Sequence, residues 1–235
     1  MREPPWRCGC CAPPAARGLG RRAALVAGAA SLLAPRARAQ SLPPPPKQGS
    51  PAVAMDRLLR GNTRYANDDV QSLDQDTTII GSGTVIQQPV FAAVLACTDL
   101  AVPVELLFDQ PVGSLHTVQT PGNVVTADAA ASLDYAVSGQ GAAAVLVLGH
   151  SGCAAIAAAV RAKPAPGKPG PYAAFARAIF EARGDATTAA HFNALIQATI
   201  LARTSATIAN RVRAGRLALV AAYFDASTGR VTIAI

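Results

Sequence analysis

VLACTDLAVPVELLFDQ, residues 94–110, contains an apolar run that stops at Cys97 and is followed at once by Thr98 and Asp99. The run begins at Phe91, and an unbroken apolar run is typical of a strand buried on both faces of a parallel sheet. A second run, AAAVLVLG at 142–149, is followed by His150 and then by Cys153. Because the carboxyl ends of parallel strands meet at one edge of a sheet, we expect these polar side chains to lie together.

The rest of the chain alternates helical and strand patterns around these two runs. Helical spacing of apolar residues begins at 54, and a shorter strand is expected at 115–120. Helices are predicted at 126–139 and 153–162, and two further helical stretches at 175–183 and 192–215. Residues 217–225 and 230–235 read as a terminal hairpin. This order predicts an α/β layer fold.

The first 39 residues have the three regions of an export signal. Basic residues ending in Arg21 and Arg22 precede an apolar run at 23–34, and the small residues Ala37 and Ala39 suit cleavage before Gln40. The run is shorter than the roughly 20 residues that span a bilayer, so we expect no stable membrane anchor. Paired arginines are compatible with twin-arginine export, although an ordinary export signal can also carry them. We therefore expect an exported protein, periplasmic or secreted, in which a proline-rich linker at 40–53 precedes one domain at 54–235.

Most of the net positive charge lies in this predicted leader. The whole chain carries a formal charge of +7, but residues 1–39 hold seven of the 21 Lys and Arg and one of the 14 Asp and Glu. The 14 basic and 13 acidic residues that remain nearly cancel, so charge gives no reason to expect a nucleic-acid partner. Three of the five cysteines also lie in the leader, which leaves Cys97 and Cys153.

Cys97, His150 and Cys153 are the candidate metal ligands. Two thiolates and an imidazole suit Zn²⁺, and three protein ligands with an open fourth position are the arrangement of a catalytic zinc. We expect Cys153 to lie near a helix N-terminus, where the helix dipole favours a thiolate. In an oxidising compartment the two cysteines could instead form a structural disulfide. His116 and His191 show no ligand spacing, and we expect them to pack against neighbours or face solvent.

From about residue 54 to 235 the chain resembles the β-class carbonic anhydrases. The segments that carry the resemblance are AMDRLLRGNTRYAND, VPVELLFDQ, PGNVV, SLDYAV, VLVLGHSGCAA and VAAYFDASTGRV. The resemblance implies a mostly parallel sheet flanked by helices and extended by an antiparallel C-terminal strand. It also implies a homodimer or a dimer of dimers.

The same resemblance implies an activity and a set of roles. The family holds zinc with a Cys-x-Asp-x-Arg motif and a His-x-x-Cys pair, which match Cys97, Asp99, His150 and Cys153. Zinc would lower the pKa of a water molecule to about 7, so that hydroxide can convert CO₂ to bicarbonate. Asp99 would be the catalytic carboxylate beside the metal, and the motif arginine would hold it away from the zinc.

Two positions depart from the family pattern. The motif arginine is replaced by Ala101, and Gln119 stands where the family commonly has a second arginine. Without its arginine, Asp99 is expected to become the fourth zinc ligand and close the site. Arg57, Arg60 and Arg64 could substitute if their helix packs on a dimer partner.

Two functions therefore follow from the sequence. The first is zinc-dependent reversible hydration of CO₂, reduced by the loss of the arginine. The alternative is a catalytically inactive zinc protein of the same fold with a structural or binding role.

Overall fold

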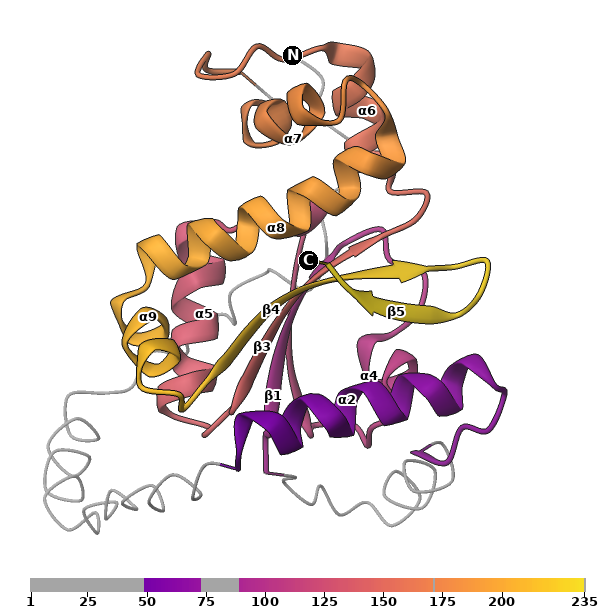
Figure 1. The fold of residues 1–235 in the computed structure, drawn as a ribbon, viewed down its shortest axis with the longest axis vertical. Helices are drawn as coiled ribbons and strands as arrows, with labels where there is room; N and C mark the ends of the chain where they lie inside the picture. Colours follow the sequence, from indigo (N-terminus) through magenta and orange to yellow (C-terminus); the bar gives the residue numbers. More distant parts are fainter. Residues whose placement is uncertain (1–48, 73–88, 171, 235) are drawn as a thin grey trace, which may run out of the picture. The chain divides into compact units, whose positions relative to one another are not determined.

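The protein is described by a computed structural model of residues 49–72, 89–170 and 172–234. Its centre is one sheet of five strands in the order β2-β1-β3-β4-β5. The strands β2, β1, β3 and β4 are parallel, and β5 pairs antiparallel with β4 (Figure 1). Their bounds are β1 Ala92–Cys97, β2 Leu115–Thr120, β3 Ala144–His150, β4 Ala218–Asp225 and β5 Arg230–Ile233. The predicted α/β fold with an antiparallel C-terminal strand is confirmed.

Helices cover both faces of this sheet (Figure 1). On one face lie α2 (Pro51–Ala66) and α4 (Val104–Leu107), and on the other lie α5 (Ala127–Ser138), α8 (Ala186–Thr204) and α9 (Ala206–Arg213). Beyond the carboxyl end of β3, α6 (Ala154–Ala162) and α7 (Ala176–Glu181) pack against α8. Two 3-10 turns complete the described elements, η2 (Pro121–Asn123) and η3 (Ala173–Phe175). No helix among the described residues is both long enough and apolar enough to span a membrane.

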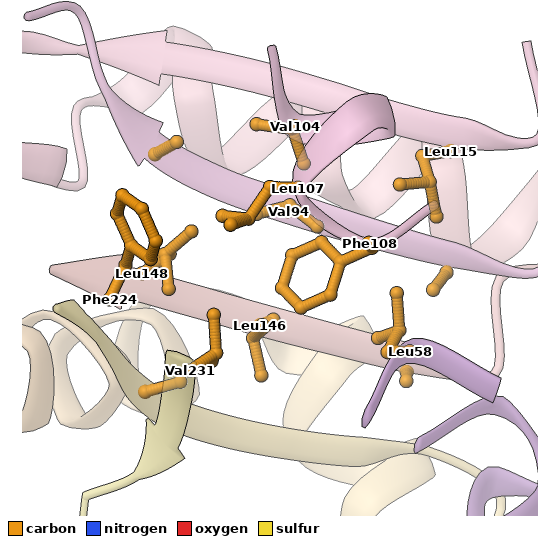
Figure 2. Close-up of a cluster of buried hydrophobic side chains, with 14 of the residues drawn as sticks. Leu58, Val94, Val104, Leu107, Phe108, Leu115, Leu146, Leu148, Phe224 and Val231 are labelled. Atoms are coloured by element: carbon orange, nitrogen blue, oxygen red, sulfur yellow. The ribbon is translucent and has the colours of Figure 1, made fainter. Parts of the chain in front are cut away.

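Strands β1 and β3 are buried along their whole length because side chains on both of their faces meet helices. Val94 and Leu146 contribute to the core under α2 and α4, together with Leu58 and Phe108 (Figure 2). The alternate residues of β1 and β3 belong to a second core, on the side of α5, α8 and α9. This two-sided burial explains why β1 and β3 read as unbroken apolar runs.

The main differences from the sequence prediction lie in the first helix and in the stretch 192–215, and α8 also begins six residues earlier than predicted, at Ala186. Helix α2 begins at Pro51, so residues 51–53 of the predicted linker are helical; proline is well tolerated in a first helical turn because its missing N–H needs no partner there. The stretch 192–215 was predicted as one helical unit, which is wrong. It divides at Ser205, which ends α8 and whose hydroxyl oxygen accepts the N–H of Ile208 to begin α9.

Candidate metal centre

Strand ends and one tight turn assemble the candidate site. Cys97 ends β1 and His150 ends the neighbouring parallel strand β3, so both side chains reach the same edge of the sheet. After His150 the chain turns through Gly152, which has a positive φ of 69°, and Cys153 becomes the N-cap residue of α6. Ligand atoms of Cys97, Asp99, His150 and Cys153 all lie within 4.8 Å of one another. The structure thus brings together all four predicted ligands, and Cys153 lies at a helix N-terminus as expected.

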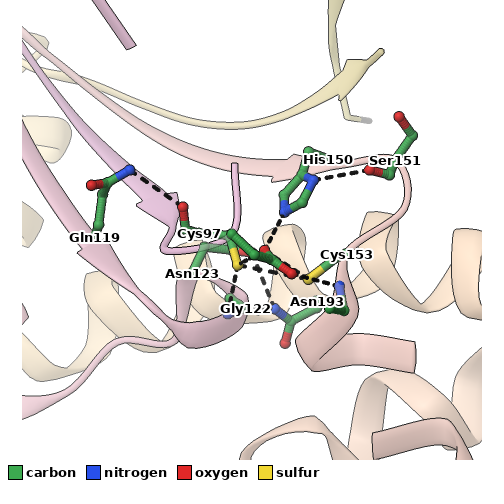
Figure 3. A network of polar contacts seen from close by, with 10 residues as sticks. Cys97, Gln119, Gly122, Asn123, His150, Ser151, Cys153 and Asn193 are labelled. Atoms are coloured by element: carbon green, nitrogen blue, oxygen red, sulfur yellow. Dashed lines mark hydrogen bonds and ion pairs between the residues drawn. The ribbon is translucent and has the colours of Figure 1, made fainter. Parts of the chain in front are cut away.

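The two cysteines are spaced for a metal rather than bonded to each other. Both are free, and their sulfur atoms are 3.7 Å apart (Figure 3). A tetrahedral zinc with Zn–S bonds of about 2.3 Å separates two sulfur ligands by about 3.8 Å. The disulfide alternative is therefore absent from the structure, and the sulfur spacing and the donor set both fit Zn²⁺.

Asp99 points into the middle of this cluster. Its Oδ1 atom lies 2.5 Å from the sulfur of Cys97, 2.8 Å from Nε2 of His150 and 3.7 Å from the sulfur of Cys153. Its other oxygen, Oδ2, accepts the N–H of Ala154 at 2.5 Å, in the first turn of α6. The carboxylate is therefore anchored by the helix N-terminus on one side and faces the other three ligands on the other.

No arginine of the described residues forms an ion pair with Asp99. Arg60 and Arg64 each pair with another acidic side chain. Arg57 lies over the ring of Phe91, with 4.0 Å between the guanidinium carbon and the ring centroid. Because Phe91 precedes β1, this contact is at the opposite end of the strand from the site. Within one chain, none of the three arginines replaces the side chain missing at position 101.

A turn after β2 supports the Cys97 sulfur. The N–H of Gly122 donates a hydrogen bond to that sulfur at 3.0 Å, and the carbonyl of Gly122 accepts one from Asn193 at 2.7 Å (Figure 3). Gln119, at the second departure from the family pattern, donates to the backbone carbonyl of Cys97 at 3.4 Å. Sequence reasoning missed Gly122, Asn193 and also Gln197, which accepts the N–H of Val125 at 2.9 Å. The available signal was an Asn and a Gln four residues apart on a helix face that otherwise carries alanine and leucine.

The hydrogen bonds of the cluster shift the proton affinities of its members. The bond with the Cys153 thiol lowers the pKa of Cys97 to about 5 against the effect of burial, and His150 acts in the same direction. The same contact, with burial, raises the pKa of Cys153. Partial burial raises the pKa of Asp99, but bonds from Cys97, Ala154 and His150 outweigh it and lower that pKa to about 2. The cluster is thus disposed to carry negative charge near neutral pH, which favours a bound cation.

The remaining histidines take no part in the cluster. Nε2 of His116 lies 2.9 Å from the hydroxyl of Ser132, and the ring of His191 stacks on Tyr223 with 3.6 Å between centroids. Both contacts agree with the packing roles expected from the sequence.

Comparisons with known proteins point to one family. The sequence model of the family "Carbonic anhydrase" matches residues 92–231. Carbonic anhydrase 2 of Mycobacterium tuberculosis is 29% identical over 195 residues, covering 78% of this chain and 93% of that protein. The carbonic anhydrase of Mycolicibacterium smegmatis is 30% identical over 198 residues, with the same coverage of each chain.

Solved structures show the same fold. The β-carbonic anhydrase CafA of Aspergillus fumigatus superposes with a TM-score of 0.57 at 16% identity, over 76% of this chain and 89% of that one. The β-carbonic anhydrase CcaA gives a TM-score of 0.56 at 21% identity, over 77% and 87%. One of two tetrameric β-carbonic anhydrases from Sordaria macrospora gives 0.54 at 17% identity, over 77% and 96%.

Proposed function

Because the chain belongs to the carbonic anhydrase family, in its β class, we propose that it is a zinc enzyme that reversibly hydrates CO₂ to bicarbonate at a reduced rate. The observation that carries this proposal is the convergence of Cys97, His150 and Cys153 with the carboxylate of Asp99. The sulfur spacing and the soft and borderline donor atoms support zinc in particular.

Cys97, His150 and Cys153 would hold the metal. Bound zinc supplies Lewis acidity, which makes hydroxide available near neutral pH for attack on CO₂. Nδ1 of His150 lies 2.9 Å from the backbone carbonyl of Ser151, a contact that fixes the ring and leaves Nε2 to face the cluster. The Gly122 N–H and the N-terminus of α6 both place positive polarity against the cysteine sulfurs.

Asp99 is the residue we hold responsible for the reduced rate. Oδ1 faces the three ligand atoms, so with zinc bound it would compete with a reacting water for a place beside the metal. Turning this oxygen aside would disturb the bond that Oδ2 accepts from the Ala154 N–H. With Ala101 in place of an arginine, no guanidinium compensates for that loss, so the closed arrangement is favoured.

A second candidate function is a catalytically inactive zinc protein of the same fold. The observation that favours it is the combination of Ala101 with an Asp99 that has no arginine partner in the described residues. Zinc would then stabilise the fold or an interaction surface.

The assembly proposed is a homodimer or a dimer of dimers. The family relationship and the strand β2, which has a neighbour on one side only among the described strands, support it. Sedimentation equilibrium on the purified protein should give a mass at least twice that of one chain, and a monomer at micromolar concentration would oppose this assignment.

We also propose export to the periplasm or the medium. The support is the sequence of residues 1–39, which lie outside the described residues together with the linker to residue 48. Mass spectrometry of protein recovered from the expressing cell's periplasm or medium should find a chain that begins at Gln40. An unprocessed chain in the cytoplasm would contradict export.

Stopped-flow measurement of CO₂ hydration tests the function directly. Protein comprising residues 40–235, loaded with zinc, is expected to hydrate CO₂ faster than the Cys97→Ala variant, because that variant lacks one of three ligands. Zinc content of both proteins is measured in parallel. A rate equal to that of the variant, with zinc bound only to the unaltered protein, would replace the enzyme assignment with the inactive zinc protein.

A further inference from the structure

Two amide side chains lie buried in the helix behind the metal site. Asn193 and Gln197 are one turn apart on α8, and their exposed fractions are 0% and 1%. Most of the other buried residues of α8 are alanines, which makes two amides on this face unusual in composition. Buried amides are costly unless their polar atoms are hydrogen-bonded, so their partners indicate what they hold in place.

These partners belong to the turn that supports Cys97. Asn193 donates to the carbonyl of Gly122 at 2.7 Å and accepts from Nε2 of Gln197 at 3.3 Å. Gln197 accepts the N–H of Val125 at 2.9 Å. Figure 3 shows the contact between Asn193 and Gly122. The amide pair therefore holds the turn at two points, 122 and 125, from a helix about 70 residues further along the chain.

The turn itself has little freedom to compensate. Gly122 has a φ of 62° inside η2, and a Cβ at this position would overlap the ring of Phe175. Its N–H points at the sulfur of Cys97, while its carbonyl points back at Asn193. Fixing the carbonyl therefore restricts the orientation of the residue whose N–H meets the sulfur.

We propose that Asn193 and Gln197 are positioning residues that hold the Gly122 N–H on the Cys97 sulfur and thereby set the strength of that sulfur as a metal ligand. The inference rests on the proposed function, because it assumes that Cys97 binds a metal. Hydrogen bonds to ligand atoms orient them and tune their donor strength, and their loss typically weakens metal binding about 10- to 100-fold.

Cobalt(II) binding tests this role with a readout other than catalysis. We expect Asn193→Leu, which conserves volume but removes all three side-chain hydrogen bonds of Asn193, to bind Co²⁺ about 10-fold more weakly or worse. The sulfur-to-cobalt charge-transfer band of this variant should also shift, because the Gly122 N–H no longer points at the Cys97 sulfur. Gln197→Met should change both quantities in the same direction by a smaller amount, and it provides the test if Asn193→Leu does not fold.

Asn62 provides a matched control. It is also a buried asparagine, 4% exposed, and it donates to the carbonyls of Leu107 and Gly229 and accepts the N–H of Val231. None of these partners belongs to the metal site or its supporting turn. Asn62→Leu should therefore lower the melting temperature while it leaves the cobalt affinity and the charge-transfer band unchanged.

The outcomes separate this role from the proposed function. Unchanged cobalt affinity and spectrum in folded Asn193→Leu or Gln197→Met, or an equal change in Asn62→Leu, would overturn the positioning role even if the unaltered protein hydrates CO₂. A shift confined to the Asn193 and Gln197 variants would support the role even if the protein proved catalytically inactive. Failure of the unaltered protein to bind cobalt or zinc would overturn both assignments.

Discussion

Asp99 is placed by the backbone of α6 as much as by its own position after β1. The Ala154 N–H lies at the positive end of a helix, where a carboxylate is favoured. Position 101 is alanine, and the Ala154 N–H supplies positive polarity to Asp99. It holds Oδ2, and this leaves Oδ1 pointing into the cluster. The helix N-terminus therefore stabilises the carboxylate without drawing it away from the ligands.

A substitution at Gly122 tests whether the turn after β2 supports both the fold and the Cys97 sulfur. Gly122→Ala places a Cβ against the Phe175 ring and requires a left-handed backbone conformation, so we expect the free energy of unfolding to fall by about 1–3 kcal/mol. Zinc affinity should fall as well, because the N–H moves off the Cys97 sulfur. Chemical denaturation and competition with a zinc chelator measure the two effects.

The double variant Gly122→Ala/Phe175→Leu is the matched comparison. Removing the ring should relieve the overlap and recover part of the zinc affinity lost in Gly122→Ala. Equal zinc affinity in Gly122→Ala and the unaltered protein would contradict the importance of this turn.

The convergence of the candidate metal ligands could be predicted from sequence, whereas the residues that support them could not. Cys97 and His150 follow apolar runs, and the rule for parallel strands places them at one edge. Asn193 and Gln197 gain their meaning only from a turn about 70 residues earlier, and no local pattern indicates that pairing. The orientation of Asp99 likewise depends on three-dimensional contacts, although the missing arginine was visible in the sequence.

At the scale of elements, Asp109 joins α2 to the segments around it. Its side chain is fully buried and pairs with Arg64 of α2, and it accepts the N–H groups of Gln71 and Ser72. Burial raises the pKa of Asp109, but these hydrogen bonds outweigh it and the net pKa is lowered. A carboxyl with a lowered folded-state pKa stabilises the fold above its unfolded pKa of about 3.9, and this contribution is lost as pH falls through the folded pKa.

Asp109→Asn should therefore destabilise the protein in a pH-dependent manner. We expect a loss of about 2 kcal/mol at pH 7, because charge-assisted bonds to buried groups are replaced by neutral ones. The difference from the unaltered protein should shrink as pH falls below about 4, where this carboxyl begins to be protonated in the unfolded chain, and it should be lost below the lowered folded-state pKa. Asparagine tolerates the positive φ of 44° at this position, so backbone strain adds little. Urea denaturation at several pH values measures the difference, and a deficit independent of pH would contradict this origin.

Strands β1 and β3 were predicted closely because burial on both faces leaves an unambiguous apolar run. The break between α8 and α9 was missed because part of its cause is tertiary. Ser205 begins α9 with its own hydroxyl, but that hydroxyl also bonds to Asp134 of α5. Apolar periodicity continues across the break, so composition alone predicts one helix.

At the scale of the whole molecule, the sequence departs from its family at the site more than in the fold. The fold is that of the β-carbonic anhydrases, and the structure brings Cys97, Asp99, His150 and Cys153 together. Position 101 is two residues after Asp99, and Gln119 bonds to the backbone of Cys97, so both departures lie close to this candidate site and the sheet is intact. A fold kept with an altered site is consistent with reduced catalysis or with another use of the same scaffold.

The central claim is that Asp99 limits hydration because position 101 lacks an arginine, and the most direct measurement compares CO₂ hydration by the zinc-loaded protein and its Ala101→Arg variant. Ala101 is exposed, so the longer side chain meets no core. A charge-assisted pair is worth about 1.5–3 kcal/mol, and 1.4 kcal/mol is tenfold in rate, so we predict an increase of about tenfold or more. An unchanged rate in a folded variant with equal zinc content would contradict the claim.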